Sequence, residues 1–321
     1  MDEKRFGRWL CALLLIAATG AHASADYSAT THRLAAGDFD GDRRADLLLI
    51  ARDSWRSSGI VLSDASGLPA RLHQSWRSDH LGIDWSGGRF LPIVGSFSTG
   101  KCTTGHMSSS CVYPQDLLLQ CATPASSPLM FVDHDRVVFD RVQQWVPDSH
   151  MGLGWSASEH HLVPGYFDND NYHDLFFQAK NAGGSNALVI TTALDGFPAS
   201  GTPRQTWAGR WAGLAWSADA AVLVAGDFNG DGFDDLLSQA RTPQDQPYAP
   251  AAFGILAGSS GGFVSSEGGE PEPWLSWTRF DFLVPDWSAT EYRLHVGNFN
   301  NDAYDDLLLQ PRHAGGPAYL V

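Results

Sequence analysis

The feature that most constrains the fold is a short pattern that occurs five times along the 321-residue chain. Each copy is an apolar run followed by glycine, any residue and phenylalanine, with an aromatic residue and serine beginning ten residues before the glycine. The copies are "LAAGDF" (34–39), "LPIVGSF" (91–97), "LVPGYF" (162–167), "VLVAGDF" (222–228) and "LHVGNF" (294–299). Such self-similarity is typical of repeat architectures, in which each unit buries an apolar face against the next.

Each repeat is interpreted as a small β-sheet, because its apolar runs are short and separated by turn residues. In the first unit the runs lie at roughly 33–37, 46–51, 59–63 and 71–77. Runs of this length, regularly punctuated, indicate strands. The units cover approximately 27–84, 85–154, 155–215, 216–286 and 287–321, so that residues 24–321 form one repeat domain.

We predict an all-β fold, a β-propeller of four-stranded blades with five repeat units visible. An array of β-sandwiches is the alternative, but the repeat glycines lie only 58–71 residues apart. A sandwich domain usually needs about 100 residues. The fifth unit reaches only its third apolar run. We therefore expect a five-bladed ring with one thin blade, with an open or partner-completed ring as the alternative.

The N-terminus predicts export. Lys4, Arg5 and Arg8 precede an apolar run at 9–18, and small residues at 21–23 offer a cleavage site. We expect residues 1–23 to be a signal peptide and the mature chain to be secreted or periplasmic, without a membrane span. The net charge of −15 and the lack of a Lys/Arg run disfavour a nucleic-acid partner.

Oxygen-bearing side chains gather in the loop that joins the first and second runs of a unit. In "GDFNGDGFDDLL" (226–237), positions 1, 3, 5 and 9 of the loop are Asp227, Asn229, Asp231 and Asp235. Calcium accepts a mixture of carboxylate, amide and backbone oxygens. The sequence therefore predicts a calcium site. An EF-hand is excluded, because Ser238 stands where that motif requires glutamate.

The other loops carry this pattern to different degrees. The first has Asp38, Asp40, Asp42 and Asp46, the third has Asp168, Asp170 and Asp174, and the fifth has Asn298, Asn300, Asp302 and Asp306. Tyr166 takes position 1 of the third loop, and Ser96 and Ser98 replace the acids of the second. We expect full Ca2+ sites in the first and fourth loops, a weaker one in the fifth and a partial one in the third. Solvated polar turns are the alternative.

The loop sequences "GDFDGDRRADLLL", "GDFNGDGFDDLL" and "GNFNNDAYDDLLL", and more loosely "GYFDNDNYHDLFF", resemble the FG-GAP/VCBS repeat family. This blade type also occurs in the integrin α-subunit propeller. The resemblance implies calcium-binding hairpins and a role in adhesion, protein binding or scaffolding. Integrin propellers have seven blades, whereas five units are visible here.

Cysteine usage fits an oxidising compartment. Cys102 and Cys111 flank an insertion in the second loop and can close a disulfide there. Cys121 follows an apolar run at a position where other units have alanine or proline, so we expect a small buried core residue.

No motif supports catalysis. The Gly-x-Ser-x-Gly match at Ser260 aligns with a turn of the repeat rather than with a strand-to-helix elbow, and "EHH" (159–161) lies in a link before a strand. We therefore expect a non-catalytic module.

The tryptophans leave a second function open. Eight of the twelve recur at two repeat positions, which favours packing between blades, whereas Trp55, Trp211 and Trp274 fall outside the pattern. A lectin-like carbohydrate-binding propeller is therefore the alternative function, and an enzyme on a propeller scaffold is less favoured. The partner would be an extracellular protein or a glycan.

Overall fold

The computed structural model describes residues 31–42, 44–64, 69–86, 88–98, 114–133, 136–168, 170, 172–191, 196–198, 200–208, 210–211, 214–242, 253–259, 262–263, 275–277, 287–297, 303–313 and 318–320. The expected signal peptide 1–23, the disulfide between Cys102 and Cys111, and the side chains of Ser260 and Trp274 lie outside these residues.

The fold is an all-β propeller, as the repeat predicts, and its blades are antiparallel sheets in sequence order. The first blade contains β1 (His32–Gly37), β2 (Asp46–Ala51), β3 (Ser58–Ser63) and β4 (Pro69–Trp76). The second contains β5 (Phe90–Gly95), β6 (Asp116–Cys121), β7 (Ser127–Met130) and β8 (Gln144–Val146). The third contains β9 (His160–Gly165), β10 (Asp174–Ala179), β11 (Ser185–Val189) and β12 (Gln205–Ala208).

The fourth blade contains β15 (Ala221–Gly226), β16 (Asp235–Ala240), β17 (Phe253–Leu256) and β18 (Leu275–Trp277). The fifth has three strands within the described residues, β19 (Tyr292–Gly297), β20 (Asp306–Pro311) and β21 (Tyr319–Leu320). A small pair, β13 (Arg210–Trp211) and β14 (Leu214–Ala215), precedes the fourth blade, and short 3-10 turns occur at His80–Gly82 and His150–Gly152. In the described part of the chain, no helix is long and apolar enough to cross a bilayer.

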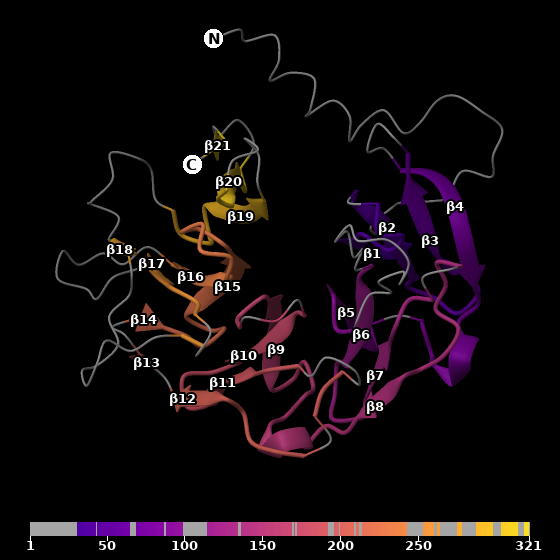
Figure 1. Ribbon diagram of the computed structural model, residues 1–321, viewed down its shortest axis with the longest axis horizontal. Helices are drawn as coiled ribbons and strands as arrows, with labels where there is room; N and C mark the ends of the chain where they lie inside the picture. Colours follow the sequence, from indigo (N-terminus) through magenta and orange to yellow (C-terminus); the bar gives the residue numbers. More distant parts are fainter. Residues whose placement is uncertain are drawn as a thin grey trace, which may run out of the picture.

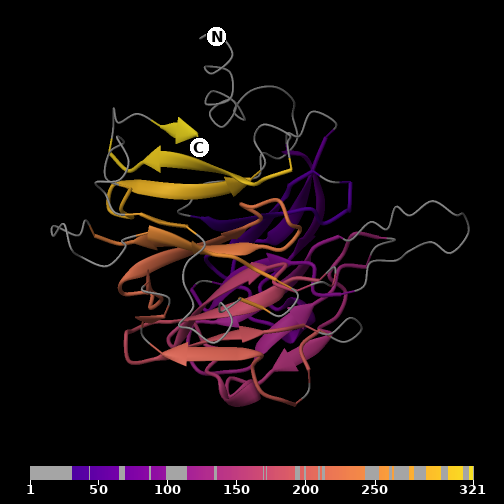
Figure 2. The same cartoon turned by 60° about the vertical axis from the view of Figure 1, so that its left-hand side comes forward.

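The blades are arranged as an arc. The inner strands lie side by side in the order β1, β5, β9, β15 and β19, and Figure 1 shows the sheets fanning out from them. Figure 2 shows the sheets stacked on one another when the arc is turned. The first and fifth blades lie on opposite sides of an opening in the arc (Figure 1). The described residues thus have the open arrangement that was the alternative to a closed five-bladed ring.

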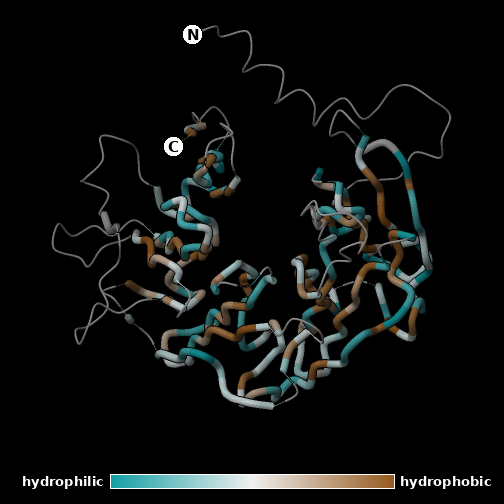
Figure 3. Tube along the Cα trace, in the orientation of Figure 1, coloured by the Kyte–Doolittle hydropathy of each residue, from teal (hydrophilic) through white to brown (hydrophobic). Residues whose placement is uncertain are grey.

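The hydrophobic core lies between blades. Side chains of a strand point alternately to its two faces, so Leu119 of β6 packs with the first blade and Leu118 with the third. The apolar stretches follow the strands, as the brown segments of Figure 3 show. Cys121 is buried at the end of β6 as an unpaired thiol, which confirms its predicted place in the core.

The repeat tryptophans pack between blades, as their spacing predicts. Trp85, Trp155, Trp216 and Trp287 are all buried. The indole N–H groups of the first three donate to the carbonyl oxygen five residues earlier in the chain, at 2.8–3.0 Å. The second repeat position is less uniform, since Trp76 is buried whereas Trp145 is 49% exposed.

The repeat glycine permits a close approach between blades. A Cβ atom added to Gly37 would lie 2.4 Å from a methyl carbon of Val94 on the next inner strand, and one on Gly226 would lie 2.5 Å from Val296. Both distances are far below van der Waals contact, so a larger residue would push the neighbouring blades apart.

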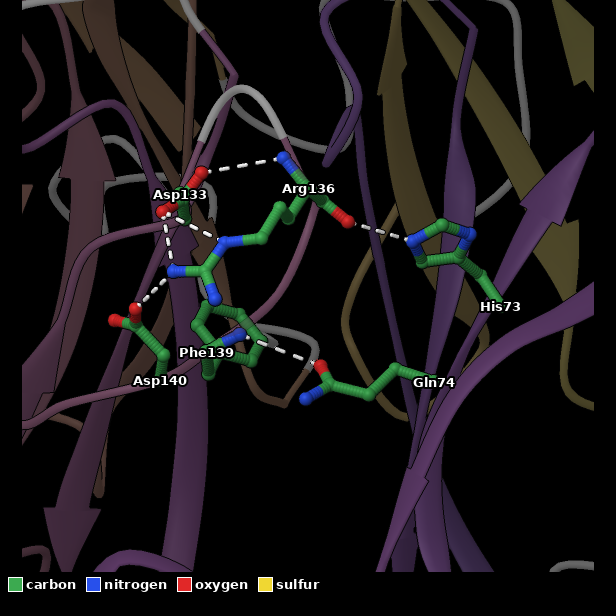
Figure 4. A network of polar contacts seen from close by, with 6 residues as sticks. All are labelled: His73, Gln74, Asp133, Arg136, Phe139 and Asp140. Atoms are coloured by element: carbon green, nitrogen blue, oxygen red, sulfur yellow. Dashed lines mark hydrogen bonds and ion pairs between the residues drawn. The ribbon is translucent and has the colours of Figure 1, made fainter.

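In each of the first three blades, a glutamine on the outer strand makes a hydrogen bond to the next blade. Its side-chain oxygen accepts the backbone N–H of a buried phenylalanine, in the pairs Gln74–Phe139 (3.3 Å), Gln144–Phe197 (3.2 Å) and Gln205–Phe263 (2.9 Å). At the first junction an ion-pair group of Arg136 with Asp133 and Asp140 lies beside this contact (Figure 4).

Candidate functional site

The acidic loops all lie at the same end of the blades, because each joins the inner strand to the second strand. In all five hairpins the glycine that ends the inner strand pairs with the aspartate that begins the second, for example Gly37 with Asp46 and Gly226 with Asp235. Gly41 and Gly230 adopt positive φ angles of 76° within their loops. Glycine tolerates that backbone conformation without strain.

The third loop gathers its acids most clearly. Carboxylate oxygens of Asp168, Asp170 and Asp174 lie within 4.8 Å of one another. Burial, with the charges of Asp168 and Asp170, raises the pKa of Asp174 to about 8, and burial with Asp168 raises the pKa of Asp170 to about 6. Asp174 Oδ1 accepts the N–H of Thr191 at 2.9 Å, whereas Oδ2 is buried without a hydrogen bond of good geometry in the described part of the chain, although the nearby N–H of Phe167 acts to lower the pKa. A buried carboxylate oxygen without such a hydrogen bond is poorly stabilised unless a cation lies beside it.

The first loop makes a similar group. Carboxylate oxygens of Asp38, Asp40 and Asp42 lie within 4.8 Å of one another, and Asp42 is also paired with Arg44. Burial and the neighbouring charges of Asp46 and Asp42 raise the pKa of Asp40. Asp46 lies behind this group and uses both oxygens, which accept the N–H groups of Phe39 (2.9 Å) and Ser63 (2.8 Å).

The fourth loop, whose donor pattern in the sequence is as complete as that of the first, is held differently. Asp227 accepts backbone N–H groups from Gly230 (2.7 Å) and Gly232 (2.9 Å), which closes the loop on itself. The side-chain amide of Asn229 donates to Asp235 Oδ1 at 3.3 Å. To offer its oxygen to a cation at that place, Asn229 would have to turn its amide over.

The second loop has no acidic group but keeps the aspartate that begins its second strand. Asp116 accepts N–H groups of Phe97 (3.0 Å) and Val132 (3.0 Å), together with the N–H and hydroxyl of Ser98. Burial raises its pKa to about 7, and these four donors act in the opposite direction. The last carboxylate of the loop therefore joins three chain segments even where the preceding acids are missing.

The fifth loop is described only in part. Asp306 begins β20 and pairs with Gly297, whereas Asn298, Asn300 and Asp302 lie outside the described residues. Their proposed role stays a prediction.

The donor sets of the first and third loops fit calcium. The ion binds oxygen ligands at about 2.4 Å, so two oxygens on one ion can be at most about 4.8 Å apart. Both carboxylate groups meet this limit, and neither contains a nitrogen or sulfur donor of the kind that zinc prefers.

Sequence reasoning missed the residue that precedes the last loop aspartate. In four blades this residue makes two hydrogen bonds to position 1 of the loop in the preceding blade. Its side chain accepts the backbone N–H of that position, and its own backbone N–H donates to the carbonyl oxygen there. The pairs are Gln115 with Asp38, His173 with Ser96, Asp234 with Tyr166 and Asp305 with Asp227. The residue type at this position differs from blade to blade, and the members share only a side-chain hydrogen-bond acceptor. That shared acceptor is the one signal in the sequence that could have identified the position. In the first blade this place is taken by Ala45.

The junction between the second and third blades is the uncharged member of this set. His173 Nδ1 accepts the N–H of Ser96 at 2.8 Å, and the His173 ring lies 4.0 Å from that of Tyr166 between centroids. Burial lowers the pKa of His173 to about 4. Tyr166 is therefore part of a packed blade junction, which explains why the third loop has no acid at position 1.

The other candidates of the sequence divide into buried and exposed groups. His160 of "EHH" is buried, and its ring nitrogens bond to the carbonyl oxygens of Gly154 (2.7 Å) and Ser185 (2.9 Å), so it serves packing. Trp211 packs on Trp207 with ring centroids 4.4 Å apart. Trp55, in contrast, is 74% exposed.

The comparisons with known proteins add little to this geometry. No protein-family model and no curated protein matches the sequence. Among solved structures, the chain is similar to a lectin of Agrocybe aegerita. That structure is described as the basis of the lectin's specific recognition of non-reducing terminal N-acetylglucosamine. The TM-score is 0.46 at 10% identity, over 92% of this chain and 81% of that chain. That likeness is too weak to bear on function.

Proposed function

We propose that the chain is an exported, calcium-stabilised β-propeller of FG-GAP/VCBS type that serves as a protein-binding, adhesion or scaffold module without catalysis. The observation that carries the proposal is the carboxylate group of the third loop. Carboxylate oxygens of three acids lie within 4.8 Å of one another, and one buried oxygen among them makes no hydrogen bond of good geometry in the described residues. An arrangement of this kind is costly without a cation.

The residues that would hold the ion are Asp168, Asp170 and Asp174 in the third blade and Asp38, Asp40 and Asp42 in the first. Calcium, when bound, supplies the positive charge that cancels the repulsion between these carboxylates. The protein's own part is to fix the inner hairpin of each blade through the last aspartate of the loop. A rigid set of loops at one end of the blades would then be available to a partner.

A thermal melt of the mature chain in calcium and in excess chelator tests this function. Extracellular modules bind calcium with dissociation constants of about 10⁻⁴–10⁻³ M, so a tenfold excess of ion over that constant stabilises by about 1.4 kcal/mol per site. In a chain of this size each kcal/mol raises the melting temperature by roughly 2–4 °C.

The variants Asp38→Ala and Asp168→Ala should each reduce the calcium-dependent rise, and Ser98→Ala, in the loop without acids, is the matched control. Equal melting temperatures in calcium and in chelator would mean that these loops are polar turns and not calcium sites. A second candidate function, binding of a carbohydrate, is favoured by the exposure of Trp55.

A further inference from the structure

The turn between β2 and β3 of the first blade, residues 52–57, presents an aromatic side chain to solvent. Trp55 has the largest exposed fraction, 74%, among the large hydrophobic side chains in the described part of the chain. It belongs to none of the four hydrophobic clusters found there. The corresponding turns of the second and third blades, 122–126 and 180–184, contain no aromatic residue. Trp55 therefore does not share the packing role of the repeat tryptophans.

The turn is held in place by its own polar contacts. Arg56 pairs with Asp53 (Nε to Oδ2, 3.2 Å), and the hydroxyl of Ser78 donates to the carbonyl of Ser54 at 3.2 Å. The Arg56 guanidinium carbon lies 3.9 Å from the centroid of the Trp55 ring. The indole thus rests with one face on a guanidinium in a fixed turn, so that little ordering is needed before a ligand binds.

The turn contains two arginines, Arg52 and Arg56, and one acid, Asp53, although the chain as a whole is acidic. Arg52 is exposed at its start, and its N–H donates to the carbonyl of Thr31 beside the inner strand. Arg33 of β1 is engaged elsewhere, since its guanidinium donates a hydrogen bond to the carbonyl oxygen of Phe90 in the second blade. The acidic loop lies at the other end of the same hairpin, about 17–20 Å away along the strand.

We propose that Trp55 and Arg52 form a binding site for a sugar that carries one carboxylate or sulfate group. The flat indole offers an apolar surface with low conformational entropy to the C–H face of a pyranose ring. A guanidinium forms paired hydrogen bonds with a planar carboxylate or with sulfate oxygens. This inference rests on the binding-module function proposed above and names a ligand class for it.

The ligand is expected to carry a single anionic group rather than many. The net charge of −15 repels an extended polyanion, and nucleic acid or an anionic membrane would bring many negative charges against that surface. One acidic sugar needs only the local positive charge of the turn.

Ligand-observed NMR with the mature full chain tests the site. The probes are the methyl glycosides of glucuronic and galacturonic acid and glucose 6-sulfate, each compared with methyl glucoside or methyl galactoside. At least one acidic probe should bind about tenfold more tightly than its neutral counterpart, and the comparison of carboxylate with sulfate identifies the anionic group. Binding that is equal for acidic and neutral sugars, or undetectable for every acidic probe, would overturn the proposal.

Matched variants locate the binding. Trp55→Ala and Arg52→Ala should each weaken it about tenfold. Trp145→Ala and Arg141→Ala remove a tryptophan and an arginine that are also exposed but lie elsewhere, and they should stay within about twofold of the parent. Equal losses in the two pairs, or tighter binding of an oligonucleotide or of anionic vesicles through Trp55, would contradict the assignment.

The measurement is repeated in calcium and in chelator, with a thermal melt of each sample. A calcium-dependent melt without sugar binding rejects this site but leaves calcium stabilisation in place. Sugar binding without a calcium-dependent melt supports this site and rejects calcium stabilisation.

Discussion

The second and third blades have the same hairpin but opposite loop chemistry. In the second, Ser96 and Ser98 stand where acids are expected, and both oxygens of Asp116 are satisfied by donors of the protein. In the third, Asp174 lies beside two further carboxylates, and one of its oxygens makes no hydrogen bond of good geometry in the described residues. The last aspartate of the loop is therefore needed by the blade itself, whereas the acids before it are the ones that we propose to hold a cation.

The largest expected effect comes from a substitution in the second blade, whose loop has no acidic group. Asp116→Ala removes the acceptor of the buried N–H of Val132 and of the N–H and hydroxyl of Ser98, whereas the N–H of Phe97 keeps the carbonyl oxygen of Gly95 at 3.1 Å. At about 1–3 kcal/mol for each stranded group, it should lower the free energy of unfolding by roughly 3–5 kcal/mol. Denaturant unfolding should give the same loss in calcium and in chelator. A loss that appears only in chelator would mean that the second loop also depends on a cation.

The next effect concerns the uncharged junction between these two blades. The pKa of His173 is about 4 in the folded protein and about 6.5 in the unfolded chain. Because the folded pKa is the lower one, the unfolded chain takes up the proton first, and stability is lost as the pH falls below about 6.5. Between pH 7.5 and pH 5 this loss amounts to about 2 kcal/mol.

His173→Gln supplies the acceptor that Gln115 uses at the first junction and should remove this pH-dependent loss. His295→Gln changes an exposed histidine and should leave the loss unchanged. If both variants retain the pH dependence of the parent, His173 is not its source.

A smaller effect separates a buried junction from the open end of the arc. Gln239 donates its amide to the carbonyl oxygens of Trp287 (2.6 Å) and Tyr292 (3.2 Å) in the fifth blade. Gln310 has the same place in β20 but is exposed. Gln239→Leu should cost about 1–2 kcal/mol in unfolding experiments, and Gln310→Leu less than about 0.5 kcal/mol. Equal costs would mean that another blade covers β20 in solution.

The smallest effect has a sign that depends on calcium. Burial and Asp168 raise the pKa of Asp170 to about 6, so its charged form is disfavoured when no cation is present. Asp170→Asn should therefore raise stability at pH 7.5 in chelator by about 1 kcal/mol, after allowance for solvent screening. In calcium the same variant should show a smaller calcium-dependent rise in stability than the parent. Denaturant midpoints in the two buffers measure both, and a variant less stable in chelator would contradict the account.

The sequence predicts the blades well because their determinants are local. Short apolar runs bounded by Gly and Asp placed the strands of the first unit close to β1–β4, and the spacing of Trp85 and Trp155 predicted their burial. Whether the arc closes was not predictable, because it depends on how neighbouring blades are inclined to one another. No single repeat unit contains that information.

The site was predictable in composition but not in detail. The acids of the first and third loops do come together, whereas the third was expected to be the weaker of the two. Tyr166 turns out to pack against His173, and this contact between two blades cannot be read from either loop alone. The closing of the fourth loop by Asp227 likewise depends on backbone geometry rather than on residue type.

The most direct test of the central claim is the calcium content of the mature chain after equilibrium dialysis, measured for the parent and for Asp40→Asn combined with Asp170→Asn. The parent is expected to bind calcium saturably and the double variant to lose sites, with Ser98→Ala unchanged. Binding no greater than that of the buffer, or binding that is the same in parent and double variant, would contradict the claim.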